Sequence, residues 1–217
     1  MDRVPIPLQV VAQGFSDWWD DWVNMAVINL VWALCWLTIV LGPPATFGIC
    51  YVTNRLVHGE ALGLWGLLEG TRRYFLQSWL WMLLNLVVAI VVVFNLGFYG
   101  RFDAAWAGLL QWAFLLLALL WLIVQFYALP YLMEQEQKRL GLALRNGLFT
   151  ALAAPGYTLV VASIAGSIAL ISLVTIIPFV LGGPCLIAAL GNHAVCERLE
   201  TYRVREQETV LGEHNDP

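Results

Sequence analysis

The sequence predicts an all-α protein in which several helices pack as a polytopic transmembrane bundle. Three observations lead to this fold class. Of the 217 residues, 60% are hydrophobic and 12% are charged, whereas an average soluble domain carries about a quarter charged residues. The mean hydropathy is +0.75. Several apolar runs approach the roughly 20 residues that a helix needs to cross a bilayer, so little of the chain is left to build a soluble domain.

The apolar runs place six candidate spans along the chain. They lie at about residues 21–41, 43–57, 76–98, 104–131, 156–180 and 182–197. The second and the sixth follow G-x-P turns and reach only about 22 to 24 Å, against about 30 Å for the hydrocarbon core. Re-entrant hairpins are therefore the alternative to two full spans.

Two further segments have leucines at helical spacing beside charged residues, and they predict amphipathic helices along the membrane interface. They are residues 61–75 and 134–149. Each carries opposite charges three or four residues apart, a spacing that lets them pair on one helical face: Glu69 with Arg72 or Arg73, and Glu134 with Lys138.

The eleven basic residues distinguish a six-span topology from a four-span one, because Lys and Arg near helix ends concentrate on the cytoplasmic side. Six spans with both termini in the cytoplasm leave only Arg101 outside, whereas four spans divide the same residues five against six. The ten cytoplasmic residues of the six-span topology are Arg3, Arg55, Arg72, Arg73, Lys138, Arg139, Arg145, Arg198, Arg203 and Arg205. We therefore predict a cell-membrane protein with a cytoplasmic N-terminal segment bearing an interfacial tryptophan belt (1–20), a single transmembrane domain (21–200) and a polar tail (201–217).

A short internal repeat marks the two short helices. Residues 40–44 read Val-Leu-Gly-Pro-Pro and residues 180–184 read Val-Leu-Gly-Gly-Pro, which gives four identities in five positions at an offset of 140. Proline suits the first turn of a helix, so we expect Pro44 and Pro184 to start these helices, with Pro43 as an extra turn residue. A pseudo-twofold axis along the membrane normal would relate the two hairpins. They are either rigid turns or helix starts whose free N–H groups hold an anionic or hydroxyl-bearing ligand in a water-filled bowl.

The candidate structural or ligand-binding residues lie in these turns and toward the cytoplasmic ends of the same helices. They are Gly42, Pro44, Thr46, Tyr51, Asn54, Arg55, Gly182, Pro184, Asn192 and Glu197. Arg55 and Glu197 either pair and lock the two hairpins together or meet water separately at their helix ends. His193, Cys196 and Glu197 share a helical face, but three candidate ligands without a fourth do not predict a metal site.

The sequence carries no pattern of catalytic groups. It has no nucleophile elbow, phosphate loop or paired-carboxylate motif, and no basic run that suggests nucleic acid. No Asp or Glu lies deep in a predicted span, which argues against a proton-driven pump. We therefore predict a protein that is not an enzyme and needs no cofactor. The mid-membrane polar residues are amides, which we expect to hydrogen-bond between helices: Asn29, Asn85, Asn95, Gln111 and Gln125.

Several short motifs are shared with a known family. The first third of the chain has an asparagine-led apolar helix, a T-x-G-P-A-T-type turn, a tyrosine-bearing helix and a basic-x-x-x-G-E ending, at residues 29–36, 38–46, 51–52 and 55–60. With Leu-Arg-Asn-Gly at 144–147 and Ala-Pro-Gly at 154–156, this pattern resembles the YesL-like family of bacterial membrane proteins, except for the inserted Pro43. The resemblance implies an association with carbohydrate uptake and carries over no catalytic residue.

Two functions fit these predictions. The first is a non-catalytic auxiliary or regulatory subunit, embedded in the lipid bilayer and bound to another membrane protein such as a carbohydrate transporter subunit. The alternative is a small stand-alone channel or facilitator built on the two G-x-P hairpins. The absence of catalytic motifs favours the first, and a bowl between the hairpins would favour the second.

Overall fold

The computed structural model describes residues 6–175 and 182–215, and within these ranges every regular element is a helix. This confirms the predicted all-α class. The helices are α1 (Ile6–Asp20), α2 (Trp22–Leu37), α3 (Gly42–Val57), α4 (Gly63–Arg73), α5 (Phe75–Tyr99), α6 (Ala105–Glu134), α7 (Leu140–Ala153), α8 (Pro155–Val174) and α10 (Gly183–Asn215).

Among the described residues, three helices are long and apolar enough to cross a membrane: α5, α6 and α8, with 25, 30 and 20 residues. They correspond to the predicted spans 76–98, 104–131 and 156–180, although residues 176–181 lie outside the described part. The apolar helices α2 and α7 are shorter, with 16 and 14 residues. By length and composition the chain thus has the helices of a membrane protein, while the count of six spans is not confirmed.

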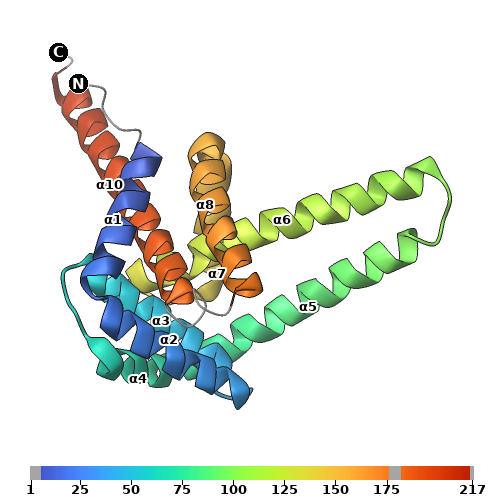
Figure 1. Ribbon diagram of the computed structural model, residues 1–217. Helices are drawn as coiled ribbons and strands as arrows, with labels where there is room; N and C mark the ends of the chain where they lie inside the picture. The colour runs from blue at the N-terminus through green and yellow to red at the C-terminus, as the bar shows by residue number, and fades with distance from the viewer. Residues whose placement is uncertain (1–5, 176–181, 216–217) are drawn as a thin grey trace.

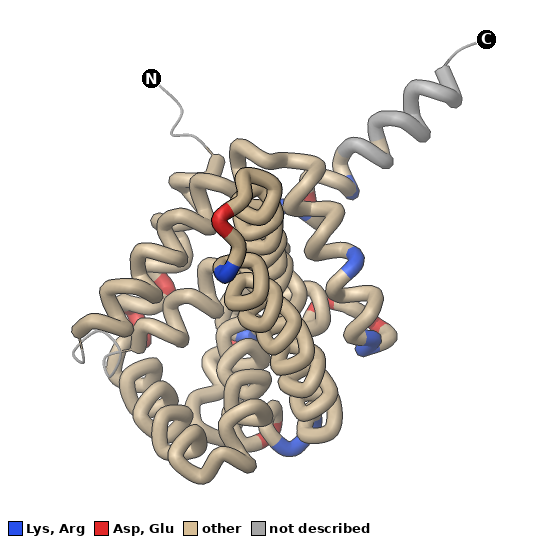
Figure 2. The backbone as a smooth tube through the Cα atoms, turned by 90° about the vertical axis from the view of Figure 1, so that its right-hand side faces the viewer, with Lys and Arg blue, Asp and Glu red and all other residues tan. Residues whose placement is uncertain are grey.

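Helices α5 and α6 form a long antiparallel hairpin, here called the arm, which projects from the rest of the molecule (Figure 1). The sequence has no Asp, Glu, Lys or Arg between Arg73 and Arg101, or between Asp103 and Glu134. Figure 2 looks along the arm and shows charged residues at its tip and in the body behind it. Helix α8 is not parallel to the arm in Figure 1, so the three long helices do not form one parallel bundle.

Hydrogen bonds from amide and indole groups join the two helices of the arm. Trp81 Nε1 donates to Gln125 Oε1 at 2.6 Å, and Trp121 Nε1 donates to Asn85 Oδ1 at 3.0 Å. Nearer the tip, Gln111 Nε2 donates to the Leu96 carbonyl at 3.1 Å. The prediction that mid-membrane amides link helices is therefore confirmed for Asn85, Gln111 and Gln125.

Of the other two amides, one bonds within its own helix and the other accepts a hydrogen bond from a second helix. Asn95 donates to the Val91 carbonyl of its own helix at 2.7 Å, so it does not confirm the prediction. Asn29 is fully buried, and the Cys185 thiol of α10 points to its side-chain oxygen at 4.0 Å.

Helix α3 lies at the centre of the body and packs against α2, α4, α5, α6 and α10. Its residues from Gly42 through Cys50 are small or apolar, except Thr46, so neighbouring helices can approach closely on several sides. Helix α3 approaches α4 closely, since a Cβ on Gly48 would lie 2.7 Å from the backbone oxygen of Leu67. Glycine at this position therefore lets two helix backbones touch.

The predicted interfacial helix at 61–75 is observed as α4, with a different partner for its acidic residue. Glu69 Oε1 accepts a hydrogen bond from Tyr51 Oη of α3 at 3.0 Å, in place of the expected pairing with Arg72 or Arg73. Gly66, Leu67 and Gly70 are buried against the body. Helix α4 has the predicted amphipathic pattern, and in addition its buried face packs against α3.

The predicted interfacial helix at 134–149 begins later and folds back along α6 as α7. A Cβ on Gly147 would lie 3.0 Å from the Val124 carbonyl, and Tyr131 Oη lies 2.6 Å from Thr150 Oγ1. Glu134 belongs to the end of α6. Lys138 Nζ donates to the Met133 carbonyl at 2.6 Å, so the expected Glu134 to Lys138 pairing is replaced by a backbone contact.

The described part of the chain begins and ends in a helix. Helix α1 lies along α10, and His193 Nε2 is 2.8 Å from Asp17 Oδ2. Helix α10 continues through position 201, where we expected a polar tail, as far as Asn215. Within the described residues, positions 6–20 therefore pack against α10 of the predicted transmembrane domain.

The two G-x-P turns begin helices close to the predicted positions. Helix α3 starts at Gly42, so Pro43 and Pro44 both lie in its first turn, and the prediction of Pro43 as an extra turn residue is wrong. Helix α10 starts at Gly183, followed by Pro184. Residues 180 and 181 of the repeat lie outside the described residues.

Candidate functional site

A cluster of polar side chains lies where the C-terminal part of α3, the end of α6 and the middle of α10 meet. We call it the polar junction, and it consists of Asn54, His58, Glu134, Asn192 and Cys196. Each helix is positioned for this contact by its apolar neighbours, among which Tyr127, Leu132, Ala194 and Val195 are almost fully buried. The polar junction is therefore held in place by a packed core.

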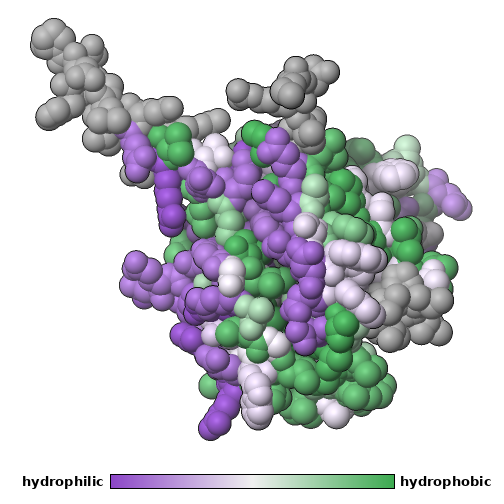
Figure 3. Space-filling model, turned by 60° about the vertical axis from the view of Figure 1, so that its left-hand side comes forward, coloured by the Kyte–Doolittle hydropathy of each residue, from purple (hydrophilic) through white to green (hydrophobic). Residues whose placement is uncertain are grey.

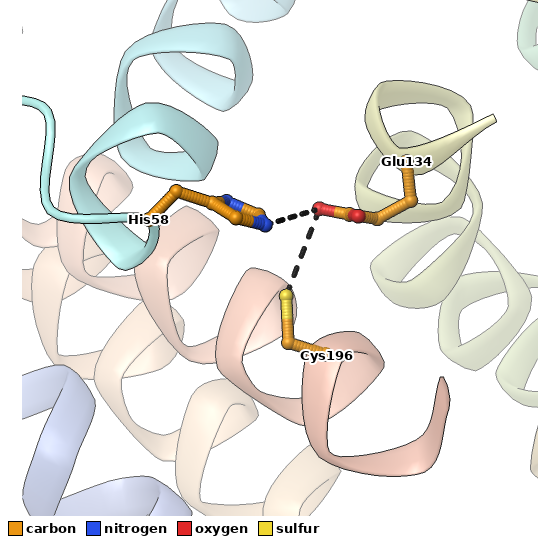
Figure 4. Close-up of side chains that lie close together, drawn as sticks. All are labelled: His58, Glu134 and Cys196. Atoms are coloured by element: carbon orange, nitrogen blue, oxygen red, sulfur yellow. Dashed lines mark hydrogen bonds and ion pairs between the residues drawn. The ribbon is translucent and has the colours of Figure 1, made fainter. Parts of the chain in front are cut away.

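Glu134, the last residue of α6, is the centre of the polar junction, and its side chain is only 19% exposed. Its Oε1 atom accepts a hydrogen bond from Asn54 Nδ2 at 2.6 Å. His58 Nε2 and Cys196 Sγ each lie 3.6 Å from the same oxygen (Figure 4). One carboxylate oxygen thus faces side chains from two other helices.

Asn192 joins α10 to α3 within the core and is fully buried. Its Oδ1 accepts from Asn54 Nδ2 at 3.2 Å, and its Nδ2 donates to Thr53 Oγ1 at 3.0 Å and to the Ala188 carbonyl at 2.9 Å. Because buried amides are costly without partners, this network fixes the relative positions of the two helices.

A pocket of about 160 Å³ opens beside Glu134. Its charged lining includes Arg55, Arg73 and Lys138, which come from α3, α4 and the α6–α7 connection, against the single carboxylate of Glu134. Burial lowers the pKa of Lys138, and the charge of Arg73 lowers it further, while Glu134 acts in the opposite direction. The pocket therefore has an excess of positive charge that suits an anionic group.

A second pocket, of about 610 Å³, lies between α1 and α10. It is lined by Cys196 and by polar residues of both helices, including Gln13, Asp17 and Glu200. Figure 3 shows hydrophilic side chains in a band down the left and middle of one face, and hydrophobic ones filling its lower right. Cys196 lines this larger pocket while Glu134 lines the smaller one, so the polar junction lies between the two.

The predicted pair of Arg55 and Glu197 is wrong. Arg55 Nη1 lies 3.5 Å from Glu60 Oε2, and Glu197 Oε2 lies 3.7 Å from Arg198 Nε. Successive residues on a helix point about 100° apart, so when Asn54 faces α10, Arg55 is turned away from it. The predicted approach of the two short helices is nevertheless confirmed, through Asn54 and Asn192.

The N-terminus of α3 is covered by indole rings and does not open into a water-filled bowl. Thr46 Oγ1 accepts from Trp32 Nε1 at 3.0 Å and from Trp36 Nε1 at 3.3 Å, and it donates to the Gly42 carbonyl. A Cβ on Gly42 would lie 2.7 Å from the Trp36 ring. Pro44 is buried in the same turn, so these residues build a rigid turn.

The start of α10 is covered in a similar way, and a pocket lies between the two helix starts. A Cβ on Gly182 would lie 2.7 Å from Trp18 Nε1. Thr46 and Pro184 line a shared pocket of about 240 Å³, whose other walls are mostly apolar side chains of α3, α6 and α10. A pocket between the two hairpins therefore exists, as predicted, but its lining is mostly apolar, whereas the prediction was of a water-filled bowl.

The predicted site residues left out three members of the polar junction, His58, Cys196 and Glu134, and the most central of these is Glu134. We assigned it to an interfacial helix because it precedes Lys138 at helical spacing. The signal that could have found it is its place at the end of 30 uncharged residues, 104–133, because a charge that ends a long apolar helix often has a specific partner. Cys196 was considered as a ligand only with His193 and Glu197, whereas His193 pairs with Asp17.

Comparison of the chain with protein-family models, curated proteins and solved structures found no match. The resemblance to the YesL-like family stays a prediction that rests on the motifs quoted above.

Proposed function

We propose that this chain is a non-catalytic, multi-pass protein of the cell membrane that serves as an accessory or regulatory subunit of another membrane protein. The observation that carries this proposal is the arm. Its helices are about 38 and 45 Å long at 1.5 Å per residue, and both exceed the hydrocarbon thickness of about 30 Å. An uncharged, projecting helix pair of this length needs lipid or another protein around it.

Side-chain exposure along the arm supports this proposal. Leu86, Ile90 and Phe94 follow one another at helical spacing on α5 and are 49%, 57% and 69% exposed. At its base the arm is fixed to the body, where the rings of Phe47 and Trp81 lie 5.7 Å apart. Exposed apolar side chains in a row, carried on a fixed base, form a surface on which a second transmembrane helix can pack.

For the topology we propose six spans with both termini in the cytoplasm. In support, Arg55, Arg73 and Lys138 line one small pocket, and the basic-residue rule assigns all three to the cytoplasm. Since α8 is not parallel to the arm (Figure 1), this topology requires α8 and the arm to cross the membrane at different tilts. The resemblance to the YesL-like family suggests a carbohydrate transporter as the partner.

Purification with a partner tests the accessory function. We expect the full chain, isolated from its native membrane in mild detergent, to bring down one membrane protein in fixed stoichiometry. Replacing Leu86, Ile90 and Phe94 together by Ala should reduce that recovery at least about tenfold, because central apolar contacts of an interface contribute about 1–2 kcal/mol each. Leu159 and Leu170 on α8 are also exposed, and their replacement by Ala is the matched control. Recovery of the chain alone, in every detergent tried, would contradict an accessory role.

A second candidate function is a small channel or facilitator, and the pocket of about 240 Å³ between the starts of α3 and α10 favours it. Liposomes containing the purified chain distinguish the two functions. We expect them to stay tight to ions and sugars, because the lining of that pocket is mostly apolar. A solute flux that Ala188→Phe blocks, by filling the pocket, would favour the channel over the accessory subunit.

A further inference from the structure

We propose that His58, Glu134 and Cys196 form a binding site for one divalent transition-metal ion, with zinc as the best match. The three side chains come from the end of α3, the end of α6 and the middle of α10 (Figure 4). Their ligand atoms, Nε2, a carboxylate oxygen and Sγ, all lie within 4.8 Å of one another. This site lies where the base of the arm meets the body, away from the exposed row on α5, and does not depend on the accessory function.

The spacing of these atoms fits tetrahedral zinc. Zinc binds His nitrogen at about 2.0–2.1 Å, carboxylate oxygen at about 2.0–2.2 Å and Cys sulfur at about 2.3 Å. Ligands at neighbouring corners of such a tetrahedron are then about 3.3–3.6 Å apart. His58 Nε2 and Cys196 Sγ each lie 3.6 Å from Glu134 Oε1, which matches two edges of the tetrahedron. The third pair, His58 Nε2 and Cys196 Sγ, lies within 4.8 Å, so closing around an ion requires at most a small approach of these two side chains.

The hydrogen bonding of His58 supports a metal independently of the distances. His58 Nδ1 lies 2.8 Å from the Asn54 backbone carbonyl. A carbonyl only accepts hydrogen bonds, so Nδ1 carries a proton, and in the neutral tautomer that this leaves Nε2 has its lone pair toward Glu134. A bound cation would be held by that lone pair and by the Glu134 carboxylate, and a metal-binding histidine usually bonds a carbonyl through its other nitrogen in this way.

The charges of the site balance when the metal is bound. Zinc binds Cys as the thiolate, so the Cys196 thiol loses its proton to solvent on binding. The dication together with one thiolate, one carboxylate and one neutral imidazole is then uncharged. This matters because Arg55, Arg73 and Lys138 line the adjoining pocket and would repel an uncompensated cation.

The ligand set also selects the metal. Mg²⁺ and Ca²⁺ prefer oxygen ligands, whereas one nitrogen, one oxygen and one sulfur suit Zn²⁺ and its spectroscopic substitute Co²⁺. Glu134 is oriented by Asn54 Nδ2 at 2.6 Å, as carboxylate ligands commonly are. The fourth position is left for water or an anion from the pocket of about 160 Å³, which His58 and Glu134 both line.

Cobalt binding tests the site directly on the full chain, purified in detergent and stripped of metal. We expect one Co²⁺ per chain, with tetrahedral d–d bands and a sulfur-to-cobalt charge-transfer band, displaced by one equivalent of Zn²⁺. Cys196→Ser should abolish the charge-transfer band. His58→Gln and Glu134→Gln should each lower zinc affinity by more than the roughly 10- to 100-fold that loss of an outer-shell partner costs.

Cys35→Ser and His193→Gln are the matched controls, because they remove a thiol and an imidazole outside the site and should leave the spectrum unchanged. Thermal unfolding without metal checks that each variant is folded. The wild-type measurement stands even if a variant unfolds: wild-type protein that binds no Co²⁺, or binds it without a sulfur band, overturns the proposal. A band that survives Cys196→Ser, or that Cys35→Ser removes, overturns it equally.

Discussion

Replacing Asn192 by Ala should lower the free energy of unfolding by about 2–4 kcal/mol, because it opens a cavity and removes hydrogen bonds inside the core. Asn192 bonds to Thr53, Asn54 and the Ala188 carbonyl and is fully buried. For a chain of this size the loss corresponds to a fall of about 5–15 °C in the thermal midpoint, which scanning fluorimetry in detergent measures.

Asn95→Ala is the matched control for this change. Asn95 is an exposed amide that bonds only to a carbonyl of its own helix in the described structure, so its removal should shift stability by no more than about 0.5 kcal/mol. Similar effects of the two substitutions would mean that the α3–α10 contact does not carry the stability we assign to it.

The double variant of Asn54 and Asn192 extends the test to the pair. Because the two amides bond to each other at 3.2 Å, their effects should not add, and the coupling should be at least about 0.5 kcal/mol. Arg55→Ala and Glu197→Ala, whose side chains have other partners, should instead be additive. Additive effects for Asn54 and Asn192, together with coupling between Arg55 and Glu197, would instead support the Arg55–Glu197 pair predicted from the sequence.

Gly48→Ala should destabilise the protein by about 1–3 kcal/mol, as overpacking of a close helix contact does. The added Cβ would lie 2.7 Å from the Leu67 backbone oxygen and 2.6 Å from Thr71 Oγ1. A backbone oxygen cannot turn away as a flexible side chain can, so α3 and α4 must separate. Thermal and denaturant unfolding in detergent measure the loss.

Gly166→Ala, on α8, is the control for Gly48→Ala. A Cβ there meets no atom within 4 Å in the described structure, and Ala is favoured over Gly inside a helix by about 0.5–1 kcal/mol. The same substitution should therefore be neutral or stabilising at Gly166 and destabilising at Gly48. Equal effects at both sites would contradict the close packing of α3 on α4.

Much of the fold followed from patterns within short stretches of sequence. The long helices α5, α6 and α8 are visible as apolar runs, and the prolines of the two turns lie in the first turns of α3 and α10. Amides such as Gln125 were expected to bond between helices because a membrane interior offers them no water. Each of these predictions depends on local composition alone.

The polar junction depends on contacts between distant residues, and this limited its prediction. Asn54 and Asn192 are 138 positions apart, and the rotation of each helix about its axis decides whether Asn54 or Arg55 faces the partner. The return of α7 along α6 depends on the close contact of Gly147 with the Val124 carbonyl. The hydropathy pattern at 134–149 is that of an amphipathic helix, whether the helix lies at the membrane interface or packs on α6. The pattern alone therefore could not distinguish the two positions.

Accessibility of two single cysteines in intact cells tests most directly the proposal that the chain spans the membrane with its polar junction toward the cytoplasm. Glu136 lies in the exposed connection beside the small pocket, and Arg101 lies at the exposed tip of the arm. Neither residue has a positive φ angle, so the backbone at both positions accepts a Cys side chain. The parent chain, with its own four cysteines, sets the background. We predict that an impermeant maleimide labels Arg101→Cys in intact cells and labels Glu136→Cys only after permeabilisation; labelling of Glu136→Cys with protection of Arg101→Cys would contradict the account.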